Sequence, residues 1–354
     1  MMYATLLDIA RSGVLAPSAD NQHVFRIEVA EASLRLWPTA EFATCGQRHR
    51  RVLGLMSLGA VVENMRLRAG ELGFVARASW FPADSVGPIA QLDLEPAPPK
   101  MLGDELASAI PARHTNRRMY GGPGLTDGEK LLLNTAVGPV EGVRLIWLQG
   151  DARRRALNLV WRAESERFVR QRLHEELYSS IRFDLSWHET ADRALPPAAL
   201  EVEAPMRPLF KALRHWALMR PLSWVGAHRL LGLRAGWLPC WQAPALGLLG
   251  TSLPVEPGAV AVGAAFERLW LRATLLGLAS QPMAAAAVLP LQSPADRGTS
   301  DGLRSVLAAG WRVICPGVMP LMIFRMGRAA RPAVTSGRRP IEDYLTTPES
   351  HGDL

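Results

Sequence analysis

The chain has 354 residues, of which 48% are hydrophobic and 21% are charged, and this composition excludes an intrinsically disordered chain. Its formal net charge of +7 favours anionic partners such as nucleotide cofactors, nucleic acid or lipid headgroups, without selecting among them. The three cysteines, Cys45, Cys240 and Cys315, stand far apart, which argues against a metal knuckle or a redox dithiol and is typical of a reducing compartment.

Targeting signals are not evident in the sequence. The N-terminus lacks the basic region and long apolar run of a signal peptide. The most apolar stretch, residues 259–291, is interrupted by Glu267, Arg268 and Arg272, whereas a membrane span needs about 18 uncharged apolar residues. We therefore expect a cytoplasmic protein without a transmembrane helix, a metal site or a membrane partner.

Hydrophobic periodicity and turn residues predict an N-terminal half that mixes helices and strands. The predicted elements are a helix over 4–14, a strand pair within 24–36, a long helix over 49–73, strands between 75 and 94, and a stiff proline-rich linker at 95–100.

The rest of the chain continues this mixture. Its predicted elements are a short helix near 103–109, a helix over 126–136, a strand over 143–147, a long helix over 151–179, helical pieces around 206–219 and 223–233, a helix over 259–278, and a last helix and strand ending near 314 and 325. We expect an α+β fold with two unequal halves, residues 1–100 and 108–345.

One internal repeat links the two halves. Residues 57–74 match residues 261–278 without a gap, 204 positions apart. Glycines recur at both ends of the repeat, where the first permits close helix contact and the last ends the helix. Such spacing favours duplication of one helix, with chance similarity of two Ala/Leu/Arg-rich helices as the alternative. The identical pairs are Gly59/Gly263, Ala60/Ala264, Glu63/Glu267, Leu67/Leu271, Arg68/Arg272, Ala69/Ala273, Leu72/Leu276 and Gly73/Gly277.

Three short segments carry polar groups suited to a ligand. Residues 16–23, between the first helix and strand, hold Ser18, Asp20, Asn21 and His23, which could contact a planar heterocycle or simply cap a turn. Residues 113–118 are rich in arginine and include a threonine, a combination that suits a phosphate or a solvated basic loop. Residues 336–344 follow a flexible glycine with a further pair of arginines.

Taken together, these segments resemble the FMN-dependent nitroreductase family, in particular its tandem, Acg-like branch. Residues 113–117 resemble the family's Arg-x-Ser-x-Arg motif, with threonine in place of serine. Residues 17–21 resemble its Pro-Ser-x-x-Asn loop, Gly277 and Leu278 its Gly-Leu helix end, and residues 338–342 its C-terminal Arg-Arg-Pro segment. The resemblance spans nearly the whole chain, although residues 180–256 contribute little.

The resemblance implies a nitroreductase-like intramolecular pseudo-dimer with one FMN per chain. In the family, one subunit gives the arginine motifs and its partner gives the Pro-Ser-x-x-Asn loop. Each half of this chain has only one of these parts, so one composite site is expected. Chemistry would occur at flavin N5, so no catalytic side chain is predicted. The expected cofactor-binding residues are Ser18, Asn21, His23, Arg113, His114, Thr115, Asn116, Arg117, Ser280, Gln281, Arg338 and Arg339.

Two parts of the chain depart from the family pattern. His23 stands where the family has glutamine, and either hydrogen-bonds the flavin or packs beneath it, with packing favoured. Residues 180–256 are rich in proline, tryptophan and arginine, and we expect a lid-like insertion over the flavin. The alternative is a basic, tryptophan-rich stretch that rests on an anionic membrane.

The resemblance implies an NAD(P)H-dependent reductase of small nitro- or quinone-like acceptors. Two alternatives stay open: a flavin-sequestering protein with a closed lid, and a dedicated biosynthetic flavin oxidase. We expect a small-molecule substrate and no nucleic-acid partner, because the basic groups cluster in the predicted flavin motifs. The chain would be a monomeric pseudo-dimer or a higher homo-oligomer.

Overall fold

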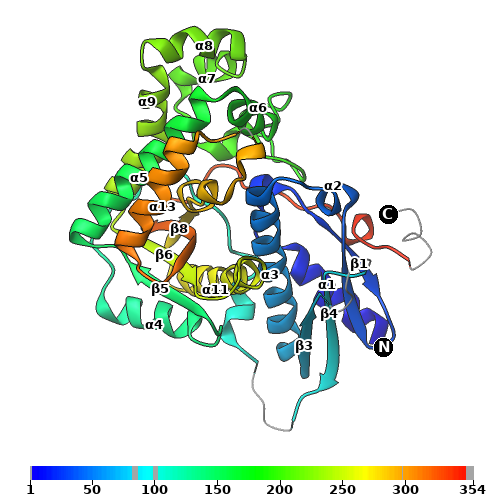
Figure 1. Cartoon of the computed structure of the whole chain (residues 1–354). Helices are drawn as coiled ribbons and strands as arrows, with labels where there is room; N and C mark the ends of the chain where they lie inside the picture. The colour runs from blue at the N-terminus through cyan, green and yellow to red at the C-terminus, as the bar shows by residue number, and fades with distance from the viewer. Residues whose placement is uncertain (1, 82–86, 99–102, 297, 348–354) are drawn as a thin grey trace.

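The computed structural model describes residues 2–81, 87–98, 103–296 and 298–347. It contains two four-stranded antiparallel sheets, one in each half of the chain, with two long helices crossing between them (Figure 1). The α+β class predicted from the sequence is confirmed. Among the described residues, none of the helices is sufficiently long and apolar to span a bilayer.

The N-terminal half forms one sheet packed on two helices. Its strands lie in the order β1-β2-β4-β3, and every neighbouring pair is antiparallel. Buried residues surround α3 over most of its length, which places this helix in the interior and not at a surface. The elements are α1 (Met2–Val14), β1 (Phe25–Val29), β2 (Ser33–Pro38), α2 (Ala40–Ala43), α3 (Arg48–Glu71), β3 (Phe74–Trp80) and β4 (Ala90–Pro96).

The C-terminal half repeats this succession of elements with insertions. Its strands lie in the order β5-β6-β8-β7, again all antiparallel. A capping box between Thr126 and Glu129 fixes the start of α4. The elements are α4 (Asp127–Val137), β5 (Val143–Trp147), β6 (Ala245–Thr251), α11 (Val255–Leu275), β7 (Ala279–Pro282), α12 (Ala285–Val288), α13 (Asp301–Ile314) and β8 (Met319–Gly327).

The repeated helices, α3 and α11, cross at equivalent glycines. A Cβ on Gly59 would lie 2.1 Å from the carbonyl oxygen of Val260, and a Cβ on Gly263 would lie 2.0 Å from that of Met56. These contacts are reciprocal, since positions 56 and 260 each immediately precede one copy of the repeat and are also 204 residues apart. Gly73 and Gly277, which follow the two helices, both have positive φ, as expected for glycines that end helices.

Six helices lie between β5 and β6 and project from the body of the molecule, with α8 at the top of Figure 1. The predicted helix over 151–179 is in fact two helices, because Arg170 adopts an extended conformation between them. We call residues 180–242 the lid segment. The helices are α5 (Gly150–Val169), α6 (Gln171–Ser179), α7 (Arg207–Ala212), α8 (Trp216–Trp224), α9 (Ala227–Gly232) and α10 (Leu238–Gln242).

The predicted insertion at 180–256 extends past the residue at which the observed insertion ends, because it includes a strand of the C-terminal sheet. Residues 245–251 form β6, a fully buried inner strand that pairs with both β5 and β8. The sequence did not predict this strand, because its residues are almost continuously apolar and include two glycines. Such a sequence lacks the alternation of apolar and polar residues that marks a half-buried strand. β7 and α12 were also missed, because each has only four residues.

The C-terminal segment of the chain reaches across to the sheet of the N-terminal half. The backbone N–H of Ile27 in β1 donates to the carbonyl oxygen of Tyr344 at 2.7 Å, and that of Thr346 donates to Ile27 at 2.9 Å. The predicted linker at 95–100 begins inside β4, which runs to Pro96, and its last two residues lie outside the described ranges. Single-turn 3₁₀ and π segments are Ala19–Asn21, Glu105–Ala109, Pro197–Leu200, Ala204–Met206, Leu233–Trp237, Leu289–Leu291, Pro294–Asp296 and Ile341–Asp343.

Candidate functional site

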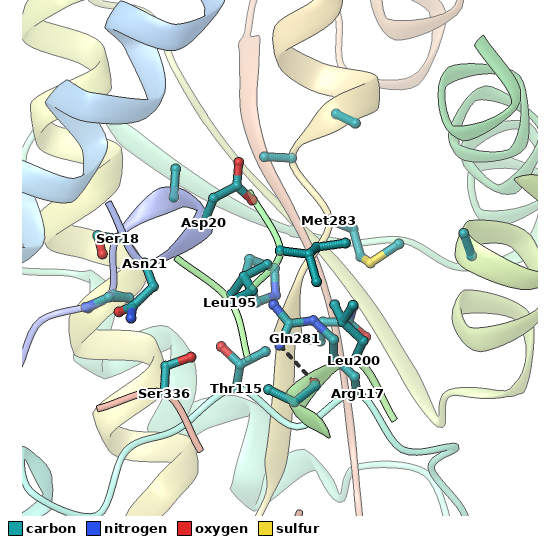
Figure 2. A pocket seen from close by; sticks show the side chains of 18 of the residues that line it. Ser18, Asp20, Asn21, Thr115, Arg117, Leu195, Leu200, Gln281, Met283 and Ser336 are labelled. Atoms are coloured by element: carbon teal, nitrogen blue, oxygen red, sulfur yellow. Dashed lines mark hydrogen bonds between the residues drawn. The ribbon is translucent and has the colours of Figure 1, made fainter. Parts of the chain in front are cut away.

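A cavity of about 1040 Å³ lies where the two halves meet the lid segment. Its walls come from the crossing helices α3 and α11, from residues 15–21 and 110–117, and from β7. Figure 2 shows the side chains of Ser18, Asp20 and Asn21, from the N-terminal half, around the same space as Thr115 and Arg117. The structure therefore brings together two stretches that are almost 100 residues apart in sequence.

The loop at 16–23 is held in an unusual backbone shape. Asp20 and Asn21 have φ values of 52° and 56°, a left-handed conformation that these two residue types tolerate better than most. The side chain of Asn21 donates to the carbonyl oxygen of Ala194 at 3.0 Å and accepts from Arg338 at 2.8 Å. Ser18 lines the cavity, and its buried hydroxyl has no hydrogen-bond partner among the described residues. This hydroxyl is available to a ligand.

Arg113 is buried at the junction of the halves. Its Nη2 donates to the carbonyl oxygen of Leu15 at 2.9 Å, and its Nε lies 3.2 Å from Oε1 of Glu267 in α11. Its guanidinium also lies over the ring of Trp270, 4.6 Å from the centroid. Burial lowers the pKa of Arg113 and raises that of Glu267 to about 7, against the opposing effect of the pair. Arg113 therefore joins the halves as well as lining the cavity.

The residues after Arg113 divide between the cavity and the protein interior. His114, Thr115 and Arg117 line the cavity, and Nη1 of Arg117 donates to the carbonyl oxygen of Ala199 at 3.1 Å. The pKa of Arg117 is lowered, because the effect of burial exceeds the opposing effect of nearby Asp20. Asn116 instead points away, and its side chain donates to the carbonyl oxygen of Ala330 at 2.9 Å.

The two C-terminal arginines have different surroundings. Arg338 lines the cavity, and its donors reach the carbonyl oxygens of Val14 at 3.0 Å and Ala16 at 2.8 Å. Burial and nearby Arg113 lower the pKa of Arg338 to about 10. Arg339 lies over the ring of Tyr344, 4.6 Å from the centroid, and outside the described lining. Arg338 therefore fixes the 14–16 backbone and adds positive charge to the cavity.

β7 forms another wall, through Gln281. The side-chain oxygen of Gln281 accepts from Nε of Arg325 at 2.7 Å, and Arg325 is fully buried on β8. Ser280, the neighbouring residue, is buried behind the wall, and its carbonyl oxygen accepts from the backbone N–H of Asn116 at 3.1 Å. Arg325 thus orients the one side chain of β7 that is both polar and part of the lining.

The lid side of the cavity is mostly apolar, although Glu176, Glu203 and Arg234 also line it. We call this part of the wall the apolar chamber, and it includes leucines, an isoleucine, a methionine and a phenylalanine from the lid segment and from α6. One end of the cavity is thus rich in arginine and hydroxyl groups, and the other end suits an apolar group. Its lining residues include Leu173, Leu177, Ile181, Leu195, Leu200, Met206, Leu209, Phe210 and Leu213.

The structure separates the twelve predicted site residues into two groups. The first group lines the cavity: Ser18, Asn21, Arg113, His114, Thr115, Arg117, Gln281 and Arg338. The second lies outside the described lining: His23, Asn116, Ser280 and Arg339. Cofactor contact stays a prediction for both groups, and only the first group is arranged for it.

Sequence reasoning missed several lining residues. Asp20 and Ser336 lie within predicted motifs and line the cavity, but neither is among the expected cofactor-binding residues. The ion pair behind the wall was also missed: Glu267, outside the described lining, is an identical position of the repeat, but its buried partner Arg113 lies 154 residues earlier, and no spacing rule connects the two. The apolar chamber carries no sequence signal, because its residues look like ordinary core.

His23 packs against aromatic rings instead of lining the cavity. Its ring lies 5.2 Å from that of Tyr344 and 6.3 Å from that of Phe25, and Nδ1 is hydrogen-bonded to the Tyr344 hydroxyl. Burial, together with Arg338, Arg339 and Arg193, lowers the pKa of His23 to about 3.

This shift predicts an acid-sensitive contribution to stability. Between pH 6.5 and 3 the unfolded chain binds a proton at His23 that the folded chain does not, so stability falls as the pH falls. When the pH is lowered from 7 to 5, the free energy of unfolding of the native protein should fall by about 2 kcal/mol more than that of His23→Gln. Urea unfolding at each pH measures both values. An equal loss in the two proteins would contradict the placement of His23.

Comparison with known proteins gives three results. No family model matches the chain. None of the curated proteins matches it either. Some solved structures are similar, with low sequence identities and low TM-scores, and they include nitroreductase-type flavoproteins.

The FMN-dependent nitroreductase NfnB from Mycobacterium smegmatis, solved in complex with NADPH, is 17% identical with a TM-score of 0.39, and the match covers 68% of this chain and 97% of that one. A BluB-like flavoprotein from Clostridium difficile 630 is 14% identical with a TM-score of 0.38, covering 69% of this chain and 99% of that one. Iodotyrosine deiodinase bound to FMN and 3-iodo-L-tyrosine is 13% identical with a TM-score of 0.36, covering 66% of this chain and 95% of that one. Values this low do not define a family.

Proposed function

We propose that this chain is an FMN-dependent oxidoreductase of the nitroreductase type, with one FMN in the cavity between its halves. The observation that carries the proposal is the meeting of residues 16–21 with residues 113–117 on one cavity wall, beside the crossing of α3 and α11. Each half contributes groups that the other lacks, as a composite site requires. The unpartnered hydroxyl of Ser18 and the positive charge of Arg117 fit a phosphorylated, acceptor-rich ligand.

We also propose that the two halves arose by duplication. Both sheets have the same strand order, and the repeated helices cross at equivalent glycines. A second reciprocal pair supports this symmetry. Arg268 lies 2.7 Å from Glu63, and the carboxylate of Glu267 interacts with Asn64, so positions 63 and 64 of one copy face positions 268 and 267 of the other.

The phosphate would lie at the arginine-rich end of the cavity. Arg117 and Thr115, with Ser18 across from them, are the groups best suited to hold it. Arg113 and Arg338 already donate to the backbone of residues 14–16, so their contribution is positive potential and rigidity.

When bound, FMN would supply two-electron redox chemistry, with NAD(P)H as the reductant. The chain's own residues would orient the cofactor and exclude water. Gln281, held by Arg325, would fix one edge of the site. The apolar chamber would accept the apolar part of a nitro- or quinone-like compound.

A second candidate, sequestration of flavin without turnover, is favoured by the tight attachment of the lid segment. Asn21 donates to the carbonyl oxygens of Ala191 and Ala194, and the backbone N–H of Gly337 donates to Ala191 at 2.8 Å. A lid fixed in this way would restrict access of a nicotinamide to the cavity.

One experiment separates the two candidates. The purified protein is examined by absorption spectroscopy, and NADPH is then added without oxygen. A yellow protein whose flavin absorption bleaches supports the oxidoreductase, and bound flavin that stays oxidised supports sequestration. Bleaching by a peptide or natural-product substrate in the absence of NADPH, reversed when oxygen is admitted, would instead support the biosynthetic oxidase, because the substrate then reduces the flavin and oxygen reoxidises it.

Neighbouring arginines give a matched test of the phosphate site. Arg117→Ala should weaken FMN binding about tenfold to 100-fold, because it removes charge-assisted hydrogen bonds. Arg118→Ala should leave the affinity unchanged, since Arg118 pairs with Glu201 at 3.2 Å and lies outside the described lining. Affinity is measured by quenching of FMN fluorescence, and equal weakening by both changes would contradict the assignment.

A further inference from the structure

The lid segment ends in a surface that is both apolar and cationic. We call residues 204–232, which include α7, α8 and α9, the lid tip. Large apolar side chains are exposed to solvent at the end of α8 and in α9: Trp224 is 80% exposed, Val225 82% and Leu230 70%. A single exposed apolar residue needs no explanation, but exposed apolar side chains gathered in one place mark an interaction site.

The charge of the lid tip is of one sign. It contains five lysine or arginine residues and no aspartate or glutamate. Lys211, Arg214, Arg220 and Arg229 are exposed. A second copy of the same surface would place like charges together, so self-association through the lid tip is disfavoured.

The helices of the lid tip have separate inner and outer faces. Leu213 and Met219 are buried in the cluster that joins α6 to α8, whereas Leu218 and Trp224 face outward. Tryptophan side chains next to arginine side chains favour the headgroup region of a bilayer over both bulk water and the hydrocarbon core. In Figure 1, α8 lies at the end of the molecule opposite α4, so a flat surface could meet the lid tip without contacting the sheets.

We propose that the lid tip docks on an anionic lipid surface, with Trp224, Val225 and Leu230 entering the headgroup region and the exposed cations facing acidic headgroups. The contact is peripheral, because no helix in the described ranges could cross the bilayer. Two independent properties of the lid tip favour binding to an anionic lipid surface: its exposed apolar side chains and its positive charge without acidic residues. Met206 and Leu209, at the start of the lid tip, line the cavity, so docking would bring an apolar phase close to the apolar chamber.

Vesicle co-sedimentation of the full chain tests the proposal without reference to FMN. Binding to vesicles of phosphatidylglycerol and phosphatidylcholine is expected to exceed binding to phosphatidylcholine alone, to weaken as salt is raised, and to shift tryptophan emission to the blue. Trp224→Ala with Leu230→Ala should lower the affinity at least about tenfold. Arg220→Glu with Arg229→Glu should lower it by about fivefold or more for each cation removed.

A matched control uses Leu131, which is 65% exposed on α4. Leu131→Ala should bind vesicles as the native chain does, and circular dichroism would establish that all variants are folded. Equal binding to neutral and anionic vesicles, unchanged binding by the lid-tip variants, or binding of duplex DNA in place of vesicles would overturn the proposal. So would a stable dimer in solution that Trp224→Ala dissociates.

Discussion

Arg113→Ala is expected to lower the free energy of unfolding by about 3–5 kcal/mol, because it leaves the carboxylate of Glu267 buried without its ionic partner. Urea unfolding followed by circular dichroism measures this loss. Burial already raises the pKa of Glu267 to about 7, and Arg113 opposes that rise. Without Arg113 the folded state should bind the proton of Glu267 more tightly, so the variant should be less stable at pH 8 than at pH 6.

A second substitution provides the control for this prediction. Arg113→Ala combined with Glu267→Gln removes the buried charge, so the double variant should recover part of the lost stability and should lose the added pH dependence. If Glu267→Gln gave no recovery in the Arg113→Ala background, the account of the pair would be wrong. Because Arg113 acts on stability, Arg117 is the better residue with which to test cofactor binding.

Gly59→Ala is expected to destabilise the chain by about 3 kcal/mol, because its Cβ would lie 2.1 Å from the backbone oxygen of Val260. Relief requires α3 and α11 to move apart, since the obstacle is backbone and not a flexible side chain. Thermal unfolding measures the effect. The separation would also enlarge the cavity beside the crossing, so FMN affinity should fall with stability.

Gly70→Ala on the same helix is the matched control for this change. Gly70 lies within α3, and the nearest atom to an added Cβ is 4.0 Å away. Alanine favours helix over glycine by about 1 kcal/mol, so Gly70→Ala should be neutral or stabilising. Similar losses from the two substitutions would contradict the close crossing of α3 and α11.

Much of the fold follows from the sequence, for physical reasons that can be named. The repeat located both crossing helices within a few residues, because Gly59 and Gly263 mark their contact and Gly73 and Gly277 mark their ends. The strand at 143–147 was predicted at its observed bounds. By contrast, β6 was hidden in a continuously apolar run, and the break at Arg170 has no proline or glycine to announce it.

The site was predictable only in its outline. The polar loop at 16–23 and the basic segment at 113–118 were recognised separately, and the structure brings them onto one cavity. Which arginines face the cavity depends on tertiary contacts, as Arg339 illustrates by packing on Tyr344 while Arg338 reaches Asn21. The sequence also contained no signal for the apolar chamber or for the ion pair of Arg113 with Glu267.

We propose that both halves of one chain together enclose one FMN. Titration of the apoprotein with FMN, followed by fluorescence quenching, tests it most directly when the native chain is compared with Ser18→Glu, which places a negative charge on the cavity wall of the N-terminal half. The account predicts saturation at one FMN per chain and much weaker binding by Ser18→Glu. Saturation at two FMN per chain, or undiminished binding by Ser18→Glu, would contradict it.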